Sequence, residues 1–181
     1  MNTFYDFTGG PSGQWKVISM QTIVGPSIEK ASYLSILPGD LRSFQDGIWS
    51  LKGFTSNVRY VEKHEKEKLN VIQPELGRPE AIYAALIPIK KNEAWWALAQ
   101  DERRKIFERD SHHTQIGLKY LPQIARRLHH CRDIGQPFDF LTWFEFTEND
   151  NALFNNLVSE LRETEEWKFV EREIDIRLVK V

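Results

Sequence analysis

Residues 110–126 read Asp-Ser-His-His-Thr-Gln-Ile-Gly-Leu-Lys-Tyr-Leu-Pro-Gln-Ile-Ala-Arg, and this stretch decides how the second half of the chain folds. Asp110 or Ser111 can cap the start of a helix by accepting hydrogen bonds from free backbone N–H groups, and Pro122 ends it. Residues at i, i+3, i+4 and i+7 share one helix face, and here they are His113, Ile116, Gly117 and Tyr120. His113 therefore interrupts a face that is otherwise apolar.

The two neighbouring histidines are predicted to differ in environment. His112 shares its face with Gln115 and Lys119, which is typical of a solvated surface. His113 is expected to be buried, and residue chemistry alone leaves a plain core histidine and a ligand equally open. Gly117, one turn further on, removes a side chain, so a flat group could approach the helix closely.

Beyond Pro122 the pattern changes to the period of two that is typical of a strand. Ile124, Arg126 and Leu128 then point to one side, and Arg127 points to the other. A guanidinium on a core-facing side is costly unless it is paired. Arg126 therefore predicts a bound anion or a partner carboxylate.

Composition limits the class of protein. The chain has 181 residues, 41% of them hydrophobic, which is enough for one large domain or two small fused ones. A formal charge of -2 argues against nucleic acid and anionic membranes as partners. Cys131 is the single cysteine, which excludes an internal disulfide framework. With no apolar run of about 18 residues and no secretory pattern in residues 1–13, a cytoplasmic location is expected.

The predicted elements describe an α+β fold. Residues 1–13 are expected to be irregular. Strands are expected at 14–24, 80–90, 123–131, 138–146 and 169–181, and residues 48–62 are expected to form one long strand or two short ones broken near Gly53. Helices are expected at 93–109, 110–121 and 148–163. The second half, residues 80–181, then follows the split βαββαβ plan of a ferredoxin-like unit. Residues 1–79, mostly strands, are interpreted as a reduced copy of it. The predicted architecture is thus two tandem ferredoxin-like units of the dimeric α/β-barrel type.

Paired histidines in a sequence can also indicate a zinc site. The pairs 112–113 and 129–130 each split across opposite faces, and no HExxH pattern is present. The sequence therefore argues against a zinc site.

Several separated residues together resemble the chlorite dismutase family of haem b enzymes. In chain order they are Lys91, Trp95-Trp96, His113, Arg126 with Leu128, Thr142-Trp143-Phe144-Glu145, and Glu166. The resemblance is strong over residues 80–181 and weak in the first half. The short chain is similar to the small members that form homodimers, so a homodimer is expected.

The resemblance assigns one set of residues to the cofactor. His113 would be the axial ligand of the haem iron, and its other ring N–H would donate to Glu166, as metal-bound imidazoles usually donate to a carboxylate. Lys91 would keep Glu166 ionised. Trp95 would pack near the haem, and Tyr60 would bond a haem propionate.

The resemblance assigns a second set of residues to the substrate, chlorite or another small anion. Arg126 would be the catalytic cation of the open side, because a guanidinium orients anions and cannot act as a base at neutral pH. Leu128, Thr142 and Phe144 would form the wall of that pocket. The implied reaction converts chlorite to chloride and dioxygen: ferric haem takes one oxygen, and the resulting ferryl species and hypochlorite recombine to form the O–O bond.

Two alternatives remain at this point. Coprohaem decarboxylases of the same superfamily resemble this chain at the proximal histidine but lack the distal arginine, so Arg126 argues against that activity. A non-enzymatic haem-binding protein would need only His113, and Arg126 would then form a structural ion pair.

Overall fold

The computed structural model describes residues 3–39, 46–55, 63, 67 and 71–181, and Tyr60 therefore lies outside the described residues. The strands are β1 (Phe4–Gly10), β2 (Trp15–Val24), β3 (Tyr33–Pro38), β4 (Trp49–Phe54), β5 (Tyr83–Lys91), β6 (Ala125–His130), β7 (Phe140–Phe146) and β8 (Val170–Lys180). The helical segments are α2 (Glu93–Ala97), α3 (Gln100–Arg104), the π-helix η1 (Lys105–Asp110), α4 (His113–Lys119), α5 (Asn151–Arg162), and the 3-10 turns η2 (Arg132–Ile134), η3 (Glu148–Asp150) and η4 (Glu165–Phe169).

The described strands close into one antiparallel barrel in the order β1-β3-β2-β8-β5-β7-β6-β4. The second half contributes β8-β5-β7-β6, which is the strand order of a βαββαβ unit, and α2 to α4 and α5 fill its two long connections. The strands of the first half lie in the corresponding order, β4-β1-β3-β2. The predicted α+β class is confirmed.

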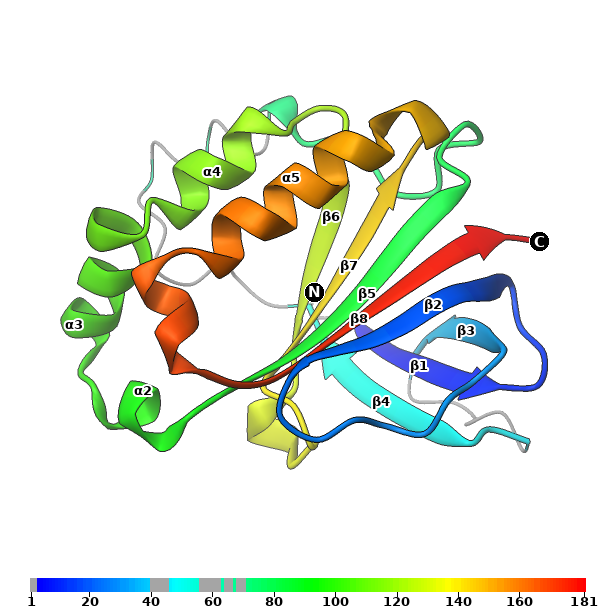
Figure 1. Ribbon diagram of the computed structural model, residues 1–181, viewed down its shortest axis with the longest axis horizontal. Helices are drawn as coiled ribbons and strands as arrows, with labels where there is room; N and C mark the ends of the chain where they lie inside the picture. The colour runs from blue at the N-terminus through cyan, green and yellow to red at the C-terminus, as the bar shows by residue number, and fades with distance from the viewer. Residues whose placement is uncertain (1–2, 40–45, 56–62, 64–66, 68–70) are drawn as a thin grey trace.

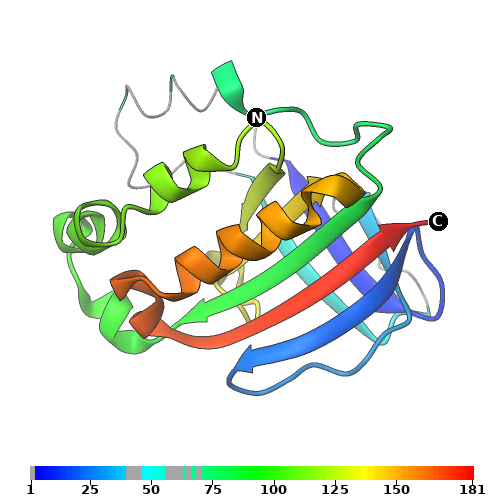
Figure 2. The same cartoon turned by 45° about the horizontal axis from the view of Figure 1, so that its top comes forward.

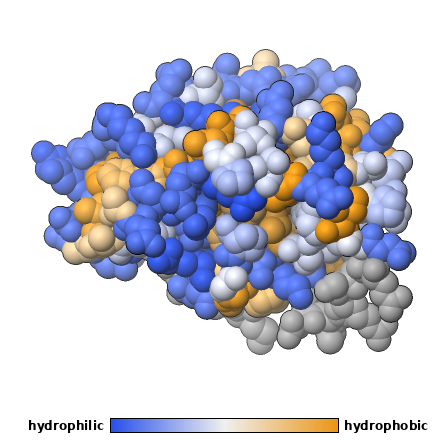
Figure 3. All heavy atoms as spheres, turned by 60° about the horizontal axis from the view of Figure 1, so that its bottom comes forward, coloured by the Kyte–Doolittle hydropathy of each residue, from blue (hydrophilic) through white to orange (hydrophobic). Residues whose placement is uncertain are grey.

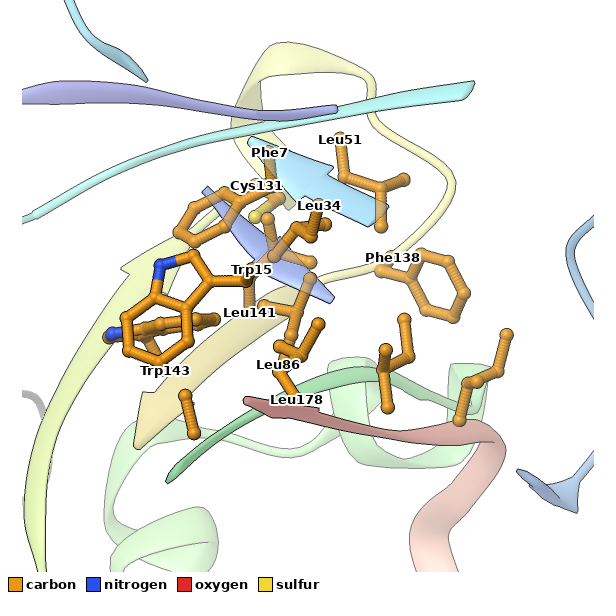
Figure 4. Packing of buried hydrophobic residues seen from close by; sticks show 13 residues of the cluster. Phe7, Trp15, Leu34, Leu51, Leu86, Cys131, Phe138, Leu141, Trp143 and Leu178 are labelled. Atoms are coloured by element: carbon orange, nitrogen blue, oxygen red, sulfur yellow. The ribbon is translucent and has the colours of Figure 1, made fainter. Parts of the chain in front are cut away.

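Two apolar cores follow from this arrangement. Inside the barrel, Trp15 and Trp143 meet edge to face at 5.2 Å between ring centroids, within a cluster that draws on strands of both halves (Figure 4). On the outer face of β5 and β7, the second cluster packs under α4 and α5, which lie side by side across the sheet (Figures 1 and 2). Ile116 and Tyr120 of α4 belong to that second cluster, as the helix periodicity predicts.

The expectation of an irregular start is wrong, because residues 4–10 form β1. Gly9 and Gly10 suggest a turn in the sequence, but they lie within the strand. A Cβ atom on Gly9 would approach Trp49 to 2.2 Å. The glycine therefore serves the close approach of the Trp49 ring, which the sequence pattern does not reveal.

The helix expected at 93–109 is interrupted. Asn92 caps its start as predicted, accepting from the backbone N–H of Trp95 at 3.0 Å. The chain then leaves helical geometry at Leu98, and Arg103 donates to the carbonyls of Trp95 and Leu98 at 3.1 and 2.8 Å. These side-chain bonds satisfy carbonyls that a continuous helix would use internally.

Candidate functional site

A cavity of about 510 Å³ lies between the outer face of the sheet and the helices α4 and α5. Its walls are largely apolar and include Ile87, Ile89, Val158 and Leu161. This volume is within the range of ordinary ligand sites. The cavity also collects the charged residues that the sequence singled out, His113, Arg126, Lys91 and Glu166.

A buried carboxylate joins an imidazole and an ammonium group at one side of the cavity. Glu166 Oε2 lies 2.6 Å from His113 Nδ1, and Glu166 Oε1 lies 2.8 Å from Lys91 Nζ. Burial of Glu166 raises the pKa of its carboxyl group, but the charges and hydrogen bonds of His113 and Lys91 outweigh that effect and lower the pKa to about 2. Glu166 is therefore ionised at neutral pH and holds His113 Nδ1 as a donor, which leaves Nε2 available as a ligand atom.

Aromatic rings fix the geometry of this group. Phe107 stacks on the His113 ring with centroids 4.3 Å apart. Lys91 Nζ lies over the rings of Trp95 and Trp167, at 4.7 and 5.3 Å from their centroids. Trp95 is thus placed beside the site as predicted. Phe107 and Trp167 also line the site, although no sequence pattern singled them out. Trp167 could have been suspected as the neighbour of Glu166, whereas Phe107 lies in a π-helix that carries no recognisable signal.

The segment before His113 is built differently from the prediction. His112 has a positive φ of 52°, and neither Asp110 nor Ser111 caps α4. Glu108 Oε2 instead accepts from the backbone N–H of Thr114 at 2.8 Å, and the Ser111 hydroxyl accepts from the backbone N–H of Glu166 at 2.8 Å. The capping expectation was wrong because η1 turns the chain so that the buried carboxylate of Glu108 reaches the helix start first.

Arg126 lies on the cavity side of β6, as the period of two predicts. Its guanidinium packs against Gly117, where a Cβ atom would approach Nη1 to 2.2 Å. The flat group that the glycine admits is therefore this guanidinium. Among the described residues, no hydrogen bond or ion pair reaches the guanidinium. Burial lowers the pKa of Arg126, but a guanidinium stays charged at neutral pH.

The residues predicted to flank Arg126 line the cavity together with it. Leu128, Thr142 and Phe144 all line the cavity. In the ladder between β6 and β7, Phe144 lies opposite Arg126 and Thr142 lies opposite Leu128. Their common position follows directly from the register of the two strands.

Arg127 departs from the prediction. The alternation placed it on the side away from Arg126, and it does reach Tyr5 of β1, whose hydroxyl accepts from Arg127 Nη1 at 2.8 Å. Arg127 and Tyr5 nevertheless line the same cavity. Among the described residues, β4 meets β6 at a single pair, Phe54 and His130.

The donor set suits haem. An imidazole whose Nδ1 is held by an ionised carboxylate is the usual arrangement behind a metal-bound histidine. The largely apolar walls of the cavity suit a flat macrocycle. His113 would hold the iron, with Trp95, Phe107 and Trp167 supporting that side.

Comparison with known proteins gives consistent findings. The family model described as chlorite dismutase matches residues 23–180. The chlorite dismutase of Ideonella dechloratans is 34% identical over 133 residues, which is 70% of this chain but only 43% of that relative.

Solved structures extend the comparison. A dimeric chlorite dismutase from Nitrobacter winogradskyi is 53% identical, with a TM-score of 0.91 over 98% of this chain and 99% of that one. A chlorite dismutase from Candidatus Nitrospira defluvii, solved with imidazole, has a TM-score of 0.68 and 20% identity over 97% of this chain and 90% of that one, and it supports the fold alone. The described residues contain no helix long and apolar enough to span a membrane.

Proposed function

The chain belongs to the chlorite dismutase family, and on that premise we propose that it converts chlorite to chloride and dioxygen in the cavity below α4 and α5. Haem b, held by His113, would supply the iron that accepts and returns one oxygen atom. The family is haem-dependent, and the pairing of His113 with Glu166 and Lys91 supports the same cofactor here.

Arg126 binds the anion in this proposal. Its positive charge attracts chlorite into a cavity with apolar walls, where a charge-assisted hydrogen bond is stronger than in water. After one oxygen atom has been transferred, hypochlorite remains as a second anion, and the same guanidinium retains it. Bound haem would supply the redox chemistry that completes the conversion to chloride and dioxygen, while Arg126 would hold the anion in place. The reaction requires no proton transfer, so it does not matter that the Arg126 guanidinium cannot act as a base.

The residues beside Arg126 would limit escape of the anion. Leu128, Thr142 and Phe144 line the same cavity on β6 and β7. Hypochlorite that is retained beside the haem site does not have to find it again by diffusion, so recombination would be favoured over escape.

The single observation that carries this proposal is the guanidinium of Arg126, which faces the cavity without a partner in the part of the chain that the structure describes. A haem carrier would leave Arg126 to a structural ion pair, and the described residues offer none. A coprohaem decarboxylase would not be expected to place an arginine there.

The same proposal includes assembly and organisation. We expect a homodimer, since the relative from Nitrobacter winogradskyi is dimeric, and a cytoplasmic location. The face in Figure 3 carries hydrophobic patches interspersed with hydrophilic side chains. The corresponding strand orders of the two halves support tandem ferredoxin-like units at 1–79 and 80–181, the second of which binds haem.

The test is to mix the haem-loaded protein with chlorite in an oxygen-electrode chamber. The expected result is one dioxygen and one chloride per chlorite consumed, since the equation ClO₂⁻ → Cl⁻ + O₂ balances without a co-reactant. Absence of dioxygen from protein with a complete Soret band would leave the haem-carrier function in its place.

A further inference from the structure

Arg127 of β6 and Tyr5 of β1 form a pair in which the guanidinium contacts both the ring and the hydroxyl. The Arg127 guanidinium lies over the Tyr5 ring, 5.6 Å from its centroid, and donates to the hydroxyl at 2.8 Å. Tyr5 is itself held in place, since its ring packs edge to face against His129 at 4.9 Å. Both side chains line the cavity. The pair is therefore rigid and accessible from the ligand space.

Among the described charged residues that line the cavity, two arginines have no carboxylate partner. Lys91 is paired with Glu166, and Arg162 is paired with Glu173. For Arg127, by contrast, the described residues provide only the neutral Tyr5 hydroxyl and no carboxylate. A guanidinium carries five N–H donors, so most of its donors remain available.

We propose that Arg127 and Tyr5 form an anion subsite that binds a carboxylate of the ligand in the cavity. Because the Tyr5 oxygen accepts from Arg127, its own O–H is free to donate. One guanidinium N–H and one phenolic O–H can thus point to the two oxygens of a single carboxylate. The adjacent Arg126 serves the substrate anion, and Arg127 serves the carboxylate.

The carboxylate could belong to a porphyrin side chain or to a small free acid. The subsite rests on the proposed function only in taking a porphyrin as the ligand, and its test needs neither iron nor chlorite. The probes are metal-free protoporphyrin IX, which has two carboxylates, and its dimethyl ester, which has none. Their affinities are measured by porphyrin fluorescence in a mild detergent for each protein variant.

The wild type should bind the diacid more tightly than the diester by roughly tenfold to hundredfold, as expected for one charge-assisted contact. Arg127→Met should reduce this preference to a few-fold at most and leave the diester affinity unchanged. Tyr5→Phe, which keeps the ring and its packing, should reduce the preference by a smaller factor. Lys119→Met removes one exposed cation from the outer face of α4 and controls for net charge; its preference should equal that of the wild type.

Two results would overturn the subsite. One is a preference for the diacid that persists unchanged in both Arg127→Met and Tyr5→Phe. The other is an equal loss of diacid and diester affinity in Arg127→Met, since that pattern means a purely structural role.

A calorimetric titration with acetate separates the two sources of carboxylate. Acetate binding that disappears in Arg127→Met identifies a site for free acids as well. If the wild type binds no acetate but still prefers the diacid to the diester, the subsite belongs to the porphyrin side chain. Activity with chlorite enters neither measurement, so failure of the subsite and failure of the proposed function are distinguishable.

Discussion

At the scale of single residues, two features organise the site: the contact between His113 Nδ1 and Glu166 Oε2, and the guanidinium of Arg126. The helix face of His113 and the strand face of Arg126 could both be predicted from periodicity. Their partners could not, because Glu166 comes from η4, far along the chain, and is in contact only through the tertiary fold. Its assignment came from the family resemblance, and the role of each residue stays a proposal.

Replacement of Arg126 tests its proposed work on anions. Arg126→Ala should lose about 1.5–3 kcal/mol of charge-assisted binding, which is roughly a tenfold to hundredfold loss in kcat/KM for chlorite. Oxygen production should persist, because no proton transfer depends on the residue. Hypochlorite should escape, and an added chlorine acceptor should trap more of it than with wild type.

Arg126→Lys is the matched variant for this comparison. An ammonium keeps the charge but loses the fork geometry, so both kcat/KM and trapping should be intermediate. Wild-type kcat/KM and trapping in Arg126→Ala would show that the guanidinium does not bind the substrate anion. Arg127 is not a suitable control, since it lines the same cavity.

At the scale of elements, the ligand segment is set by the junction of η1 and α4. The sequence predicts the helix correctly, and Ile116 and Tyr120 are buried as expected. The His113 side chain, expected to be buried, is 23% exposed, and the predicted cap is wrong. A capping residue is normally sought immediately before the helix. The π-helix changes that rule here, since it brings Glu108 under the start of α4 while Ser111 turns to Glu166.

Removal of the Glu108 cap should therefore weaken α4 and the position of His113 together. Glu108→Ala should lower the free energy of unfolding by about 1 kcal/mol, the usual loss for a helix cap. Glu108→Gln retains an acceptor oxygen and should preserve most of the stability that the cap provides. Chemical denaturation and haem titration measure the two effects. If Glu108→Ala has the unfolding free energy and the haem affinity of the wild type, the cap does not hold His113 in position.

At the scale of the whole molecule, the closed barrel shows where sequence patterns stop being informative. The order of strands in the second half could be read from the alternation of elements. The first strand was missed because its glycines resemble a turn and because its need for Gly9 arises from Trp49, a distant residue. The closure of β1 onto β4 also decides that Arg127 reaches Tyr5, which no local pattern contains.

Closure of the barrel also buries a histidine that should make the fold sensitive to acid. Burial lowers the pKa of His129 to about 4, assisted by the charges of Arg127 and His130 and opposed by a hydrogen bond with the Leu141 carbonyl. An unfolded histidine has a pKa of about 6.5. As the pH falls from about 6.5 to about 4, the unfolded chain takes up a proton that the folded chain resists. Folding stability should thus fall by about 3 kcal/mol over that window and lose nothing more from this group below it.

His129→Gln tests this assignment, because an amide can still donate to the Leu141 carbonyl but does not titrate. Unfolding free energies should be measured between pH 7 and pH 4. They should decline less steeply with falling pH in the variant, and the slope should correspond to the uptake of up to one proton fewer on unfolding. Parallel curves for the two proteins would show that His129 does not contribute to acid sensitivity.

In the proposed reaction, one chlorite supplies both atoms of the dioxygen because the hypochlorite never leaves the cavity. The most direct measurement is mass spectrometry of the gas released from chlorite labelled with ¹⁸O in unlabelled water. The account predicts dioxygen that carries two ¹⁸O atoms, with little singly labelled gas. Dioxygen that contains a substantial share of oxygen from water, or no dioxygen at all, would contradict it.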